Sequence, residues 1–204
     1  MYMDERFLDV VNQKKRDEAA EAEVEVRRKA IGEGIRAGSL TMEGKEIKFM
    51  VKVLLDDRIR ISLPEDFTQM SPADAELKYP SARRPGLIYT NPGGNVNLTF
   101  NHTVTQMKLA DLDVFRQTMW QTVKKMQGAA RLQADGSRNI NGRMVGFLEF
   151  MTPALETQIY NLVYFTELEG RALLVSFNCS SAVMDPWRLV AGEMLGTLEI
   201  IMAA

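Results

Sequence analysis

Cysteine and histidine are almost absent from this sequence, which has one of each among its 204 residues. The single cysteine, Cys179, cannot close a disulfide within the chain, so nothing indicates an oxidising compartment. The single histidine, His102, cannot build a histidine-rich metal site. No serine stands in a nucleophile-elbow context, and only His102 could act as its base. The sequence therefore disfavours hydrolases of the Ser–His–Asp and Cys–His types.

Neither sign of charge dominates, and long apolar runs are missing. The 25 basic and 27 acidic side chains give a formal net charge of -2, which provides no basic field for nucleic acid or for an anionic membrane surface. No stretch reaches the roughly 18 consecutive apolar residues of a membrane span. The first residues lack the pattern of a signal peptide. We therefore expect a cytoplasmic protein with no membrane span and no nucleic-acid partner.

Motifs for phosphate and cofactor binding are also missing. The turn "NPGG" at 91–94 lacks the Lys-Ser/Thr pair of a phosphate loop. The glycines of "IGEGIRAG" at 31–38 follow a predicted helix, whereas a dinucleotide-binding loop follows a strand. Cys179 lies in the apolar run "LLVSFNCSS", which favours a buried and inert thiol. We expect no catalytic residues, no cofactor and no metal.

Residues 4–37 have the composition of a long helix, because they contain no proline and are rich in Ala, Glu, Lys and Arg. Their apolar residues are sparse and keep no sustained heptad. We expect either a solvated helix or an arm used for docking or self-association. Gly32, Gly34 and Gly38 are expected to mark where the helix frays into the domain. The predicted division is a helical arm over residues 1–38 and one domain over residues 39–204.

The hydrophobic period changes to two at Ile47, which is typical of strands. The alternation places Val51 and Val53 on the core side of the first strand. It places Met50 and Leu54 on the opposite side, where they would form a candidate partner patch. Asp56-Asp57 predicts a turn to a second strand that ends at Pro64.

The rest of the chain alternates between strand groups and helices. Ser71 and Pro72 predict the start of a short helix, and Asp185 is the expected N-cap of a C-terminal helix. A longer amphipathic helix is expected over 110–128. Strands joined by short turns imply an antiparallel sheet, so we predict an α+β sandwich with helices layered on that sheet. The expected strands lie at 47–55, 59–63, 86–90, 95–104, 129–139, 143–151, 157–167 and 171–179.

The most unusual stretch is "KYPSARRPGLIYTNPGGNVNLTFNHT" at 78–103. Alternation assigns Val96, Leu98 and Phe100 to the core and leaves a ladder of Asn and Thr residues on the opposite face. One interpretation is a solvated strand face. The other is a ligand pocket lined by that ladder, with an arginine of the preceding loop as an anion contact. The candidate binding residues are Arg83, Arg84, Asn95, Asn97, Thr99 and Asn101.

Three segments resemble the bacterial DcrB-like group of the PsbP-like fold. They are "ISLPEDF", "RPGLIYTNPGGNVNLTFN" and "RALLVSFNCSSAVMDPWRLVAGEMLGTLEI". The resemblance covers roughly residues 45–202 and leaves the arm outside. It implies an α/β/α sandwich with a central antiparallel sheet. It also implies protein binding more than catalysis, since the fold includes photosystem accessory subunits, a Ran-binding cofactor and chaperones of secretion effectors.

The functional expectation is therefore a non-enzymatic adaptor or chaperone-like protein with an unidentified protein partner. It could self-associate through residues 4–37. The alternative is a domain, enzyme-like in form, that binds a small ligand through the polar strand face.

Overall fold

The structure is a computed structural model that describes residues 3–81 and 84–201, with side chains described from residue 9 onward. The described residues form two antiparallel sheets and four α-helices. The smaller sheet has the strand order β1-β2-β3-β11, and the larger one has the order β4-β5-β6-β10-β9-β8-β7. The small-sheet strands are β1 (Ser39–Met42), β2 (Lys45–Leu54), β3 (Ile59–Pro64) and β11 (Glu199–Ile200). The large-sheet strands are β4 (Thr68–Gln69), β5 (Leu87–Thr90), β6 (Val96–Gln106), β7 (Arg131–Ile140), β8 (Arg143–Pro153), β9 (Gln158–Leu168) and β10 (Arg171–Ser180).

The helices are α1 (Met3–Ala37), α2 (Pro72–Lys78), α3 (Leu112–Met126) and α4 (Met184–Leu195). Apolar side chains on the two faces of the large sheet build two separate clusters. The larger one joins that sheet to the small sheet and α4 through residues such as Phe177, Ile61 and Met194. The smaller one packs α3 on the other face, around Leu148 and Phe165. These layers confirm the predicted α+β sandwich, and the small sheet adds a layer that the alternation pattern did not separate.

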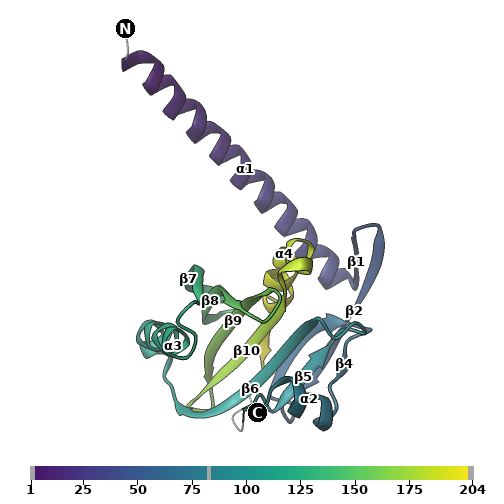
Figure 1. The fold of residues 1–204 in the computed structure, drawn as a ribbon. Helices are drawn as coiled ribbons and strands as arrows, with labels where there is room; N and C mark the ends of the chain where they lie inside the picture. Colours follow the sequence, from purple (N-terminus) through teal and green to yellow (C-terminus); the bar gives the residue numbers. More distant parts are fainter. Residues whose placement is uncertain (1–2, 82–83, 202–204) are drawn as a thin grey trace.

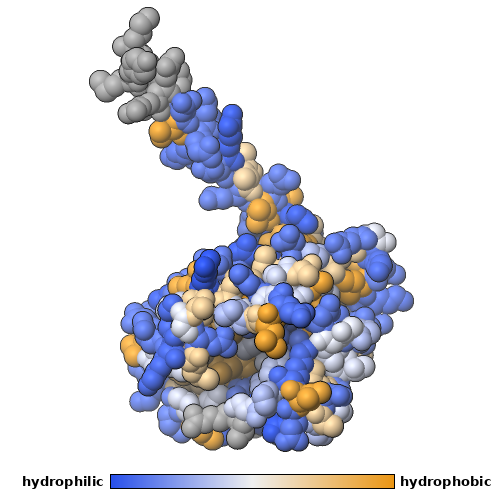
Figure 2. Space-filling view, viewed as in Figure 1, coloured by the Kyte–Doolittle hydropathy of each residue, from blue (hydrophilic) through white to orange (hydrophobic). Residues whose placement is uncertain are grey.

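Helix α1 projects away from the sheets, with α4 at its base (Figure 1). At about 1.5 Å per residue, its 35 residues reach roughly 50 Å. The surface of the projecting part is mostly hydrophilic (Figure 2). Only the last turns enter the domain, where Ile35 is 2% exposed. Among the described residues, no helix combines the length and apolar character needed to cross a membrane.

The predicted fraying at the glycines of α1 is wrong, because the helix continues through Gly32 and Gly34 to Ala37. Gly32 instead allows close packing against α4. A Cβ atom at this position would lie 2.8 Å from Oε2 of Glu193. Gly38 ends the helix with a positive φ of 96°, the conformation that favours glycine after a helix.

The predicted buried and exposed faces of β2 are exchanged in the middle of the strand. Lys52 pairs with Ile61 and Leu54 pairs with Ile59, so these positions share the buried face. Val51 and Val53 point outward and are 57% and 46% exposed. Both faces of β2 carry apolar residues, and alternation alone cannot choose between them. Met50 is exposed as predicted but Leu54 is buried, so the proposed Met50–Leu54 patch does not form.

Two predicted helix starts have different outcomes. Ser71 is confirmed as the N-cap of α2, and its Oγ accepts a hydrogen bond from the Asp74 N–H at 3.2 Å. Asp185 is not the N-cap of α4. That helix follows a 3₁₀ turn at Ser181–Val183, which makes Val183 the capping residue and places Asp185 in the first turn.

Candidate binding groove

Three asparagines form a row across adjacent strands of the large sheet. Asn178 of β10 lies opposite Asn97 of β6 on one side and opposite Asn161 of β9 on the other. Directly opposed residues of antiparallel strands project from the same face. The neighbouring residues on this face are polar on β6 and β10 and apolar on β9. We call the three aligned asparagines the amide row.

The segment after α2 covers one end of the amide row and extends it by hydrogen bonds. Lys78 Nζ donates to Asn97 Oδ1 at 2.9 Å. Asn97 Nδ2 donates to Asn178 Oδ1 at 3.0 Å, and Asn178 Nδ2 donates to the Tyr79 hydroxyl at 3.3 Å. Each amide thus accepts on its oxygen and donates from its nitrogen, which lets the bonds polarise one another. The Tyr79 hydroxyl also lies 3.5 Å from Asn178 Oδ1, to which its O–H can donate.

Asn161 belongs to the row but not to this chain of hydrogen bonds. Its Nδ2 donates to Thr152 Oγ1 at 3.1 Å and to the Ile159 carbonyl at 3.0 Å. Within the described part of the chain, no group donates to its Oδ1. Asn161 therefore offers a hydrogen-bond acceptor to an incoming molecule.

The amide row lies in a groove of about 430 Å³ between the end of α2 and the end of α3. Its lining is mostly amide and hydroxyl, with apolar side chains at one side. The lining residues are Lys78, Tyr79, Asn95, Asn97, Gln127, Thr152, Pro153, Ile159, Asn161, Asn178, Cys179 and Ser180.

Two ionisable groups of the groove are shifted toward their neutral forms by burial. Lys78 remains exposed along its side chain, yet partial desolvation lowers the pKa of its ammonium group. Desolvation also raises the pKa of Tyr79, and the hydrogen bond with Asn178 opposes this shift. Tyr79 is therefore a neutral phenol with an O–H that can donate.

The predicted polar ladder is only partly a solvated face. Asn97 and Thr99 are 2% and 4% exposed, so the solvated interpretation is wrong for both. Asn97 is buried because Lys78 and the segment that follows it fold over the strand. Asn95 is exposed at the rim of the groove, where its Oδ1 accepts from Asn91 at 2.8 Å. Val96, Leu98 and Phe100 are buried, as predicted.

The structure does not bring the arginine loop to this groove. Arg83 lies outside the described residues. Arg84 pairs with Glu76 at 3.4 Å and lines a separate hollow with Pro72 and Ile88. Asn101 is half-buried further along β6 and does not line the groove.

Sequence reasoning found Asn95 and Asn97 but missed the other ten lining residues of the groove, among them Lys78, Asn161 and Asn178. A signal was present, because Asn161 and Asn178 each interrupt an apolar strand at a position alternate to core residues. Their alignment with Asn97 depends on the register of three strands, and local alternation contains no information on that register.

Comparisons by sequence find no matching family and no matching curated protein. Solved structures do match in shape. CyanoP, the cyanobacterial PsbP of Synechocystis sp. PCC 6803, superposes with a TM-score of 0.56 at 14% identity, over 75% of this chain and 92% of CyanoP. The fold is PsbP-like. At this identity the likeness establishes the fold alone, and it confirms that part of the resemblance found in the sequence.

Two further structures match the PsbP-like chain less well. LpqN, a protein involved in cell envelope biogenesis of Mycobacterium tuberculosis, has a TM-score of 0.49 at 10% identity, over 76% of this chain and 92% of LpqN. PA94 of Pseudomonas aeruginosa has a TM-score of 0.45 at 12% identity, over 76% of this chain and 99% of PA94.

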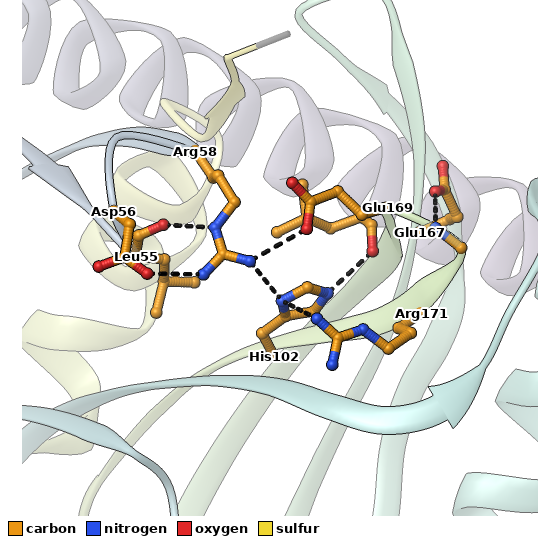
Figure 3. A network of polar contacts seen from close by, with 9 residues as sticks. Leu55, Asp56, Arg58, His102, Glu167, Glu169 and Arg171 are labelled. Atoms are coloured by element: carbon orange, nitrogen blue, oxygen red, sulfur yellow. Dashed lines mark hydrogen bonds and ion pairs between the residues drawn. The ribbon is translucent and has the colours of Figure 1, made fainter. Parts of the chain in front are cut away.

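The one histidine of the PsbP-like chain has a structural environment (Figure 3). His102 Nε2 lies 2.9 Å from the Leu168 carbonyl, while Nδ1 lies 3.1 Å from Arg58 and 3.2 Å from Arg171. A carbonyl can only accept and a guanidinium can only donate, so these contacts fit the tautomer that carries its hydrogen on Nε2. His102 is half-buried inside β6, four residues before that strand ends, and all three of its partners come from other elements. Val104, two residues further along β6, is 85% exposed.

Arg58 links this histidine to two loops of the PsbP-like fold. Its guanidinium lies 3.0 Å from Asp56 in the β2–β3 turn and 3.0 Å from Glu169 in the β9–β10 turn. The cluster thus joins the small sheet to the large one. This structural role accounts for the presence of both arginines and the histidine.

The single cysteine lies on the core side of β10. Cys179 is 1% exposed, and burial raises the pKa of its thiol to about 12. The thiol stays protonated near neutral pH, which confirms the prediction of a buried, unreactive cysteine. Within residues 3–81 and 84–201, no three His, Cys, Asp or Glu side chains gather as a metal site requires.

Proposed function

We propose that this chain is a non-catalytic binding protein, of the adaptor or chaperone-like kind, that holds a segment of a partner protein in the groove over the amide row. The observation that carries the proposal is the row itself. Asn97, Asn178 and Asn161 stand on three adjacent strands, at spacings of about 4.8 Å expected of neighbouring strands.

The chemistry of the row suits a polypeptide. An asparagine side chain carries one carbonyl and one amino group, which is the same pair of functions that each peptide bond presents. The half-buried members of the row, Asn178 and Asn161, can pair with the main chain of an extended segment, whatever its sequence, while the buried Asn97 holds Asn178 in place. Amide and hydroxyl side chains also form these bonds without titrating near neutral pH, which fits binding better than acid–base catalysis.

Three related expectations stay proposals. We propose that the chain belongs with the DcrB-like proteins inside the PsbP-like fold, on the strength of the three segments that resemble that group. A cytoplasmic location also stays a prediction, which cell fractionation would test. Self-association through residues 4–37 would use Val10, Val24 and Val26, which are exposed on α1 and separated by charged residues.

The test is to select peptides that bind the groove and to compare their affinities for the wild type and for matched variants. A phage-displayed peptide library is panned against the full chain, and the selected peptides are titrated by isothermal calorimetry. N161A removes an amide from the row, and Q127A removes one from the rim. Q121A, an exposed position on the same helix as the α3 end of the groove, is the control.

We expect at least tenfold weaker binding to N161A and Q127A and unchanged binding to Q121A, with melting temperatures showing that all three fold. Peptides that bind all variants equally, or a library that gives no binder, would reject the proposal.

A small polar ligand is the second candidate, because 430 Å³ lies within the usual range of about 300–1,000 Å³ for ligand pockets. A thermal-shift screen of amino acids and simple sugars tests it. A shift that N161A removes, without any peptide binder, would favour the small ligand over the polypeptide.

A further inference from the structure

Lys78 is the one charged side chain among the residues that line the groove. It is the last residue of α2, and its ammonium reaches across to the turn before β6. There it donates to the Gly94 carbonyl and to Asn97 Oδ1. Both acceptors are neutral. Among the described residues, no carboxylate lies within ion-pair distance of Lys78.

The charge of Lys78 is therefore held in place but not neutralised. An ammonium group has three N–H donors, and the two carbonyl oxygens use two of them. The third remains for a molecule in the groove. Partial desolvation lowers the pKa of Lys78, and an anion beside it would oppose that shift by favouring the charged form.

The amide row extends the effect of this charge. Lys78 donates to Asn97, which donates to Asn178, which donates to Tyr79. A cation at the start of such a chain polarises every following bond. The Tyr79 O–H itself lies 3.5 Å from Asn178 Oδ1, so the ammonium of Lys78 is the donor of the groove on which this inference rests.

The arginine of the neighbouring loop has a different environment. Arg84 is already paired with Glu76 at 3.4 Å and lines another hollow. The two cations are close in sequence, but only Lys78 is without an acidic partner in the described residues. Arg84 is therefore a suitable control.

We propose that the groove recognises a carboxylate group of its partner segment and that Lys78 is the anion contact. The carboxylate could belong to an acidic side chain or to a chain terminus, since both present two acceptor oxygens to an ammonium group. This inference rests on the proposed binding function of the groove and adds the chemical class of what binds.

Three short peptides distinguish a side-chain carboxylate from the carboxylate of a chain terminus. The first is acetyl-Asn-Ser-Glu-Ser-amide, the second replaces Glu by Gln, and the third is acetyl-Asn-Ser-Gly with a free carboxyl terminus. Each is titrated into the isotopically labelled full chain, and NMR follows the side-chain amide signals of Asn97, Asn178 and Asn161. The same titrations are run on K78M, K78R and R84M, after thermal melts confirm that each variant folds.

We expect the Glu peptide, the free-acid peptide or both to bind at least tenfold more tightly than the Gln peptide. The dissociation constants come from the shifts of these amide signals. K78M should abolish this preference, K78R should keep part of it, and R84M should leave it unchanged. The preference should also weaken with added salt.

Three outcomes would overturn the inference. Equal binding of the Gln and Glu peptides would reject a carboxylate contact but leave the groove as a peptide site. Absence of any shift in the three asparagines, with all three peptides, would reject the carboxylate contact and the proposed function together. A preference that K78M retains would assign the contact to another residue.

Discussion

Arg28 of α1 lies with its Nε 3.4 Å from Oε1 of Glu193 in α4, and this ion pair fastens the projecting helix to the domain. The Glu193 side chain is only 15% exposed. Burial raises the pKa of Glu193, and the nearby cations Arg28, Arg36 and Arg138 oppose the shift without cancelling it. The carboxyl group therefore holds its proton more tightly in the folded chain than in the unfolded chain.

The first prediction concerns the pH dependence of Glu193. A raised folded-state pKa contributes stability below the unfolded-state pKa, and this contribution is lost as pH rises through the folded-state value. The E193Q variant has no carboxyl group at this position, so its stability does not fall for this reason as pH rises. We expect its free energy of unfolding, relative to the wild type, to rise by up to about 1 kcal/mol between about pH 4 and pH 7, since partial exposure screens the effect.

Urea denaturation across that pH range measures the difference. The E21Q variant, on the exposed part of α1, should show no such trend. A relative stability of E193Q that falls as pH rises would contradict a raised pKa for Glu193.

The second prediction concerns the amide row. N178L keeps the branched shape of the side chain but leaves Asn97 Nδ2 without its acceptor and Tyr79 without its donor. We expect a loss of about 1–3 kcal/mol in the free energy of unfolding, measured by chemical denaturation. S176A changes a side chain on the same face and strand and should cost under about 0.5 kcal/mol. Equal costs would mean that the hydrogen-bond chain adds little to stability.

The third prediction concerns the cluster around His102. H102L removes the acceptor of Arg58 and Arg171 and the donor to the Leu168 carbonyl. We expect thermal and urea unfolding to show a loss of about 1–3 kcal/mol. The control is V104T, at a position 85% exposed two residues further along β6, which should be close to neutral. A stable H102L variant would show that the arginines find other partners.

The fourth prediction concerns Gly146 of β8, which faces an aromatic ring. A Cβ atom there would lie 2.2 Å from Cε2 of Phe165, whose side chain is buried between the sheet and α3. G146A should therefore cost at least about 1–3 kcal/mol through overpacking. G128A, at a glycine with no atom within 4 Å of its added Cβ, is the matched control. A wild-type melting temperature for G146A would mean that Phe165 moves freely.

The fifth prediction concerns truncation of α1. Within residues 1–26, the side chains described from residue 9 onward are exposed except for the half-buried Val11. After deletion of residues 1–26 the melting temperature should therefore stay within a few degrees of the full chain. Deleting residues 1–37 also removes Ile35, a core residue that is 2% exposed, and should cost at least about 2–5 kcal/mol. Light scattering on the shorter deletion shows whether the arm sets the oligomeric mass. Equal stability of both deletions would mean that the core does not need Ile35.

The sequence by itself determined the order and type of the longer elements, but not the short strands β1, β4 and β11. The helix at its start, the alternating strands and the α+β class follow from local periods of 3.6 and 2, which depend only on near neighbours in the chain. Local chemistry also placed Ser71 as a cap and the alternate residues Val96, Leu98 and Phe100 in the core. Each of these outcomes needs no knowledge of distant segments.

The tertiary structure decided which faces meet. β2 carries apolar residues on both sides, so only its pairing with Ile59 and Ile61 showed which side is buried. The candidate groove depends even more on distant segments. Asn97, Asn161 and Asn178 are up to 81 residues apart, and the register of three strands brings them into one row. Lys78 then replaces Arg84 as the cation at that row, because α2 ends beside the turn before β6 while the arginine pairs with Glu76.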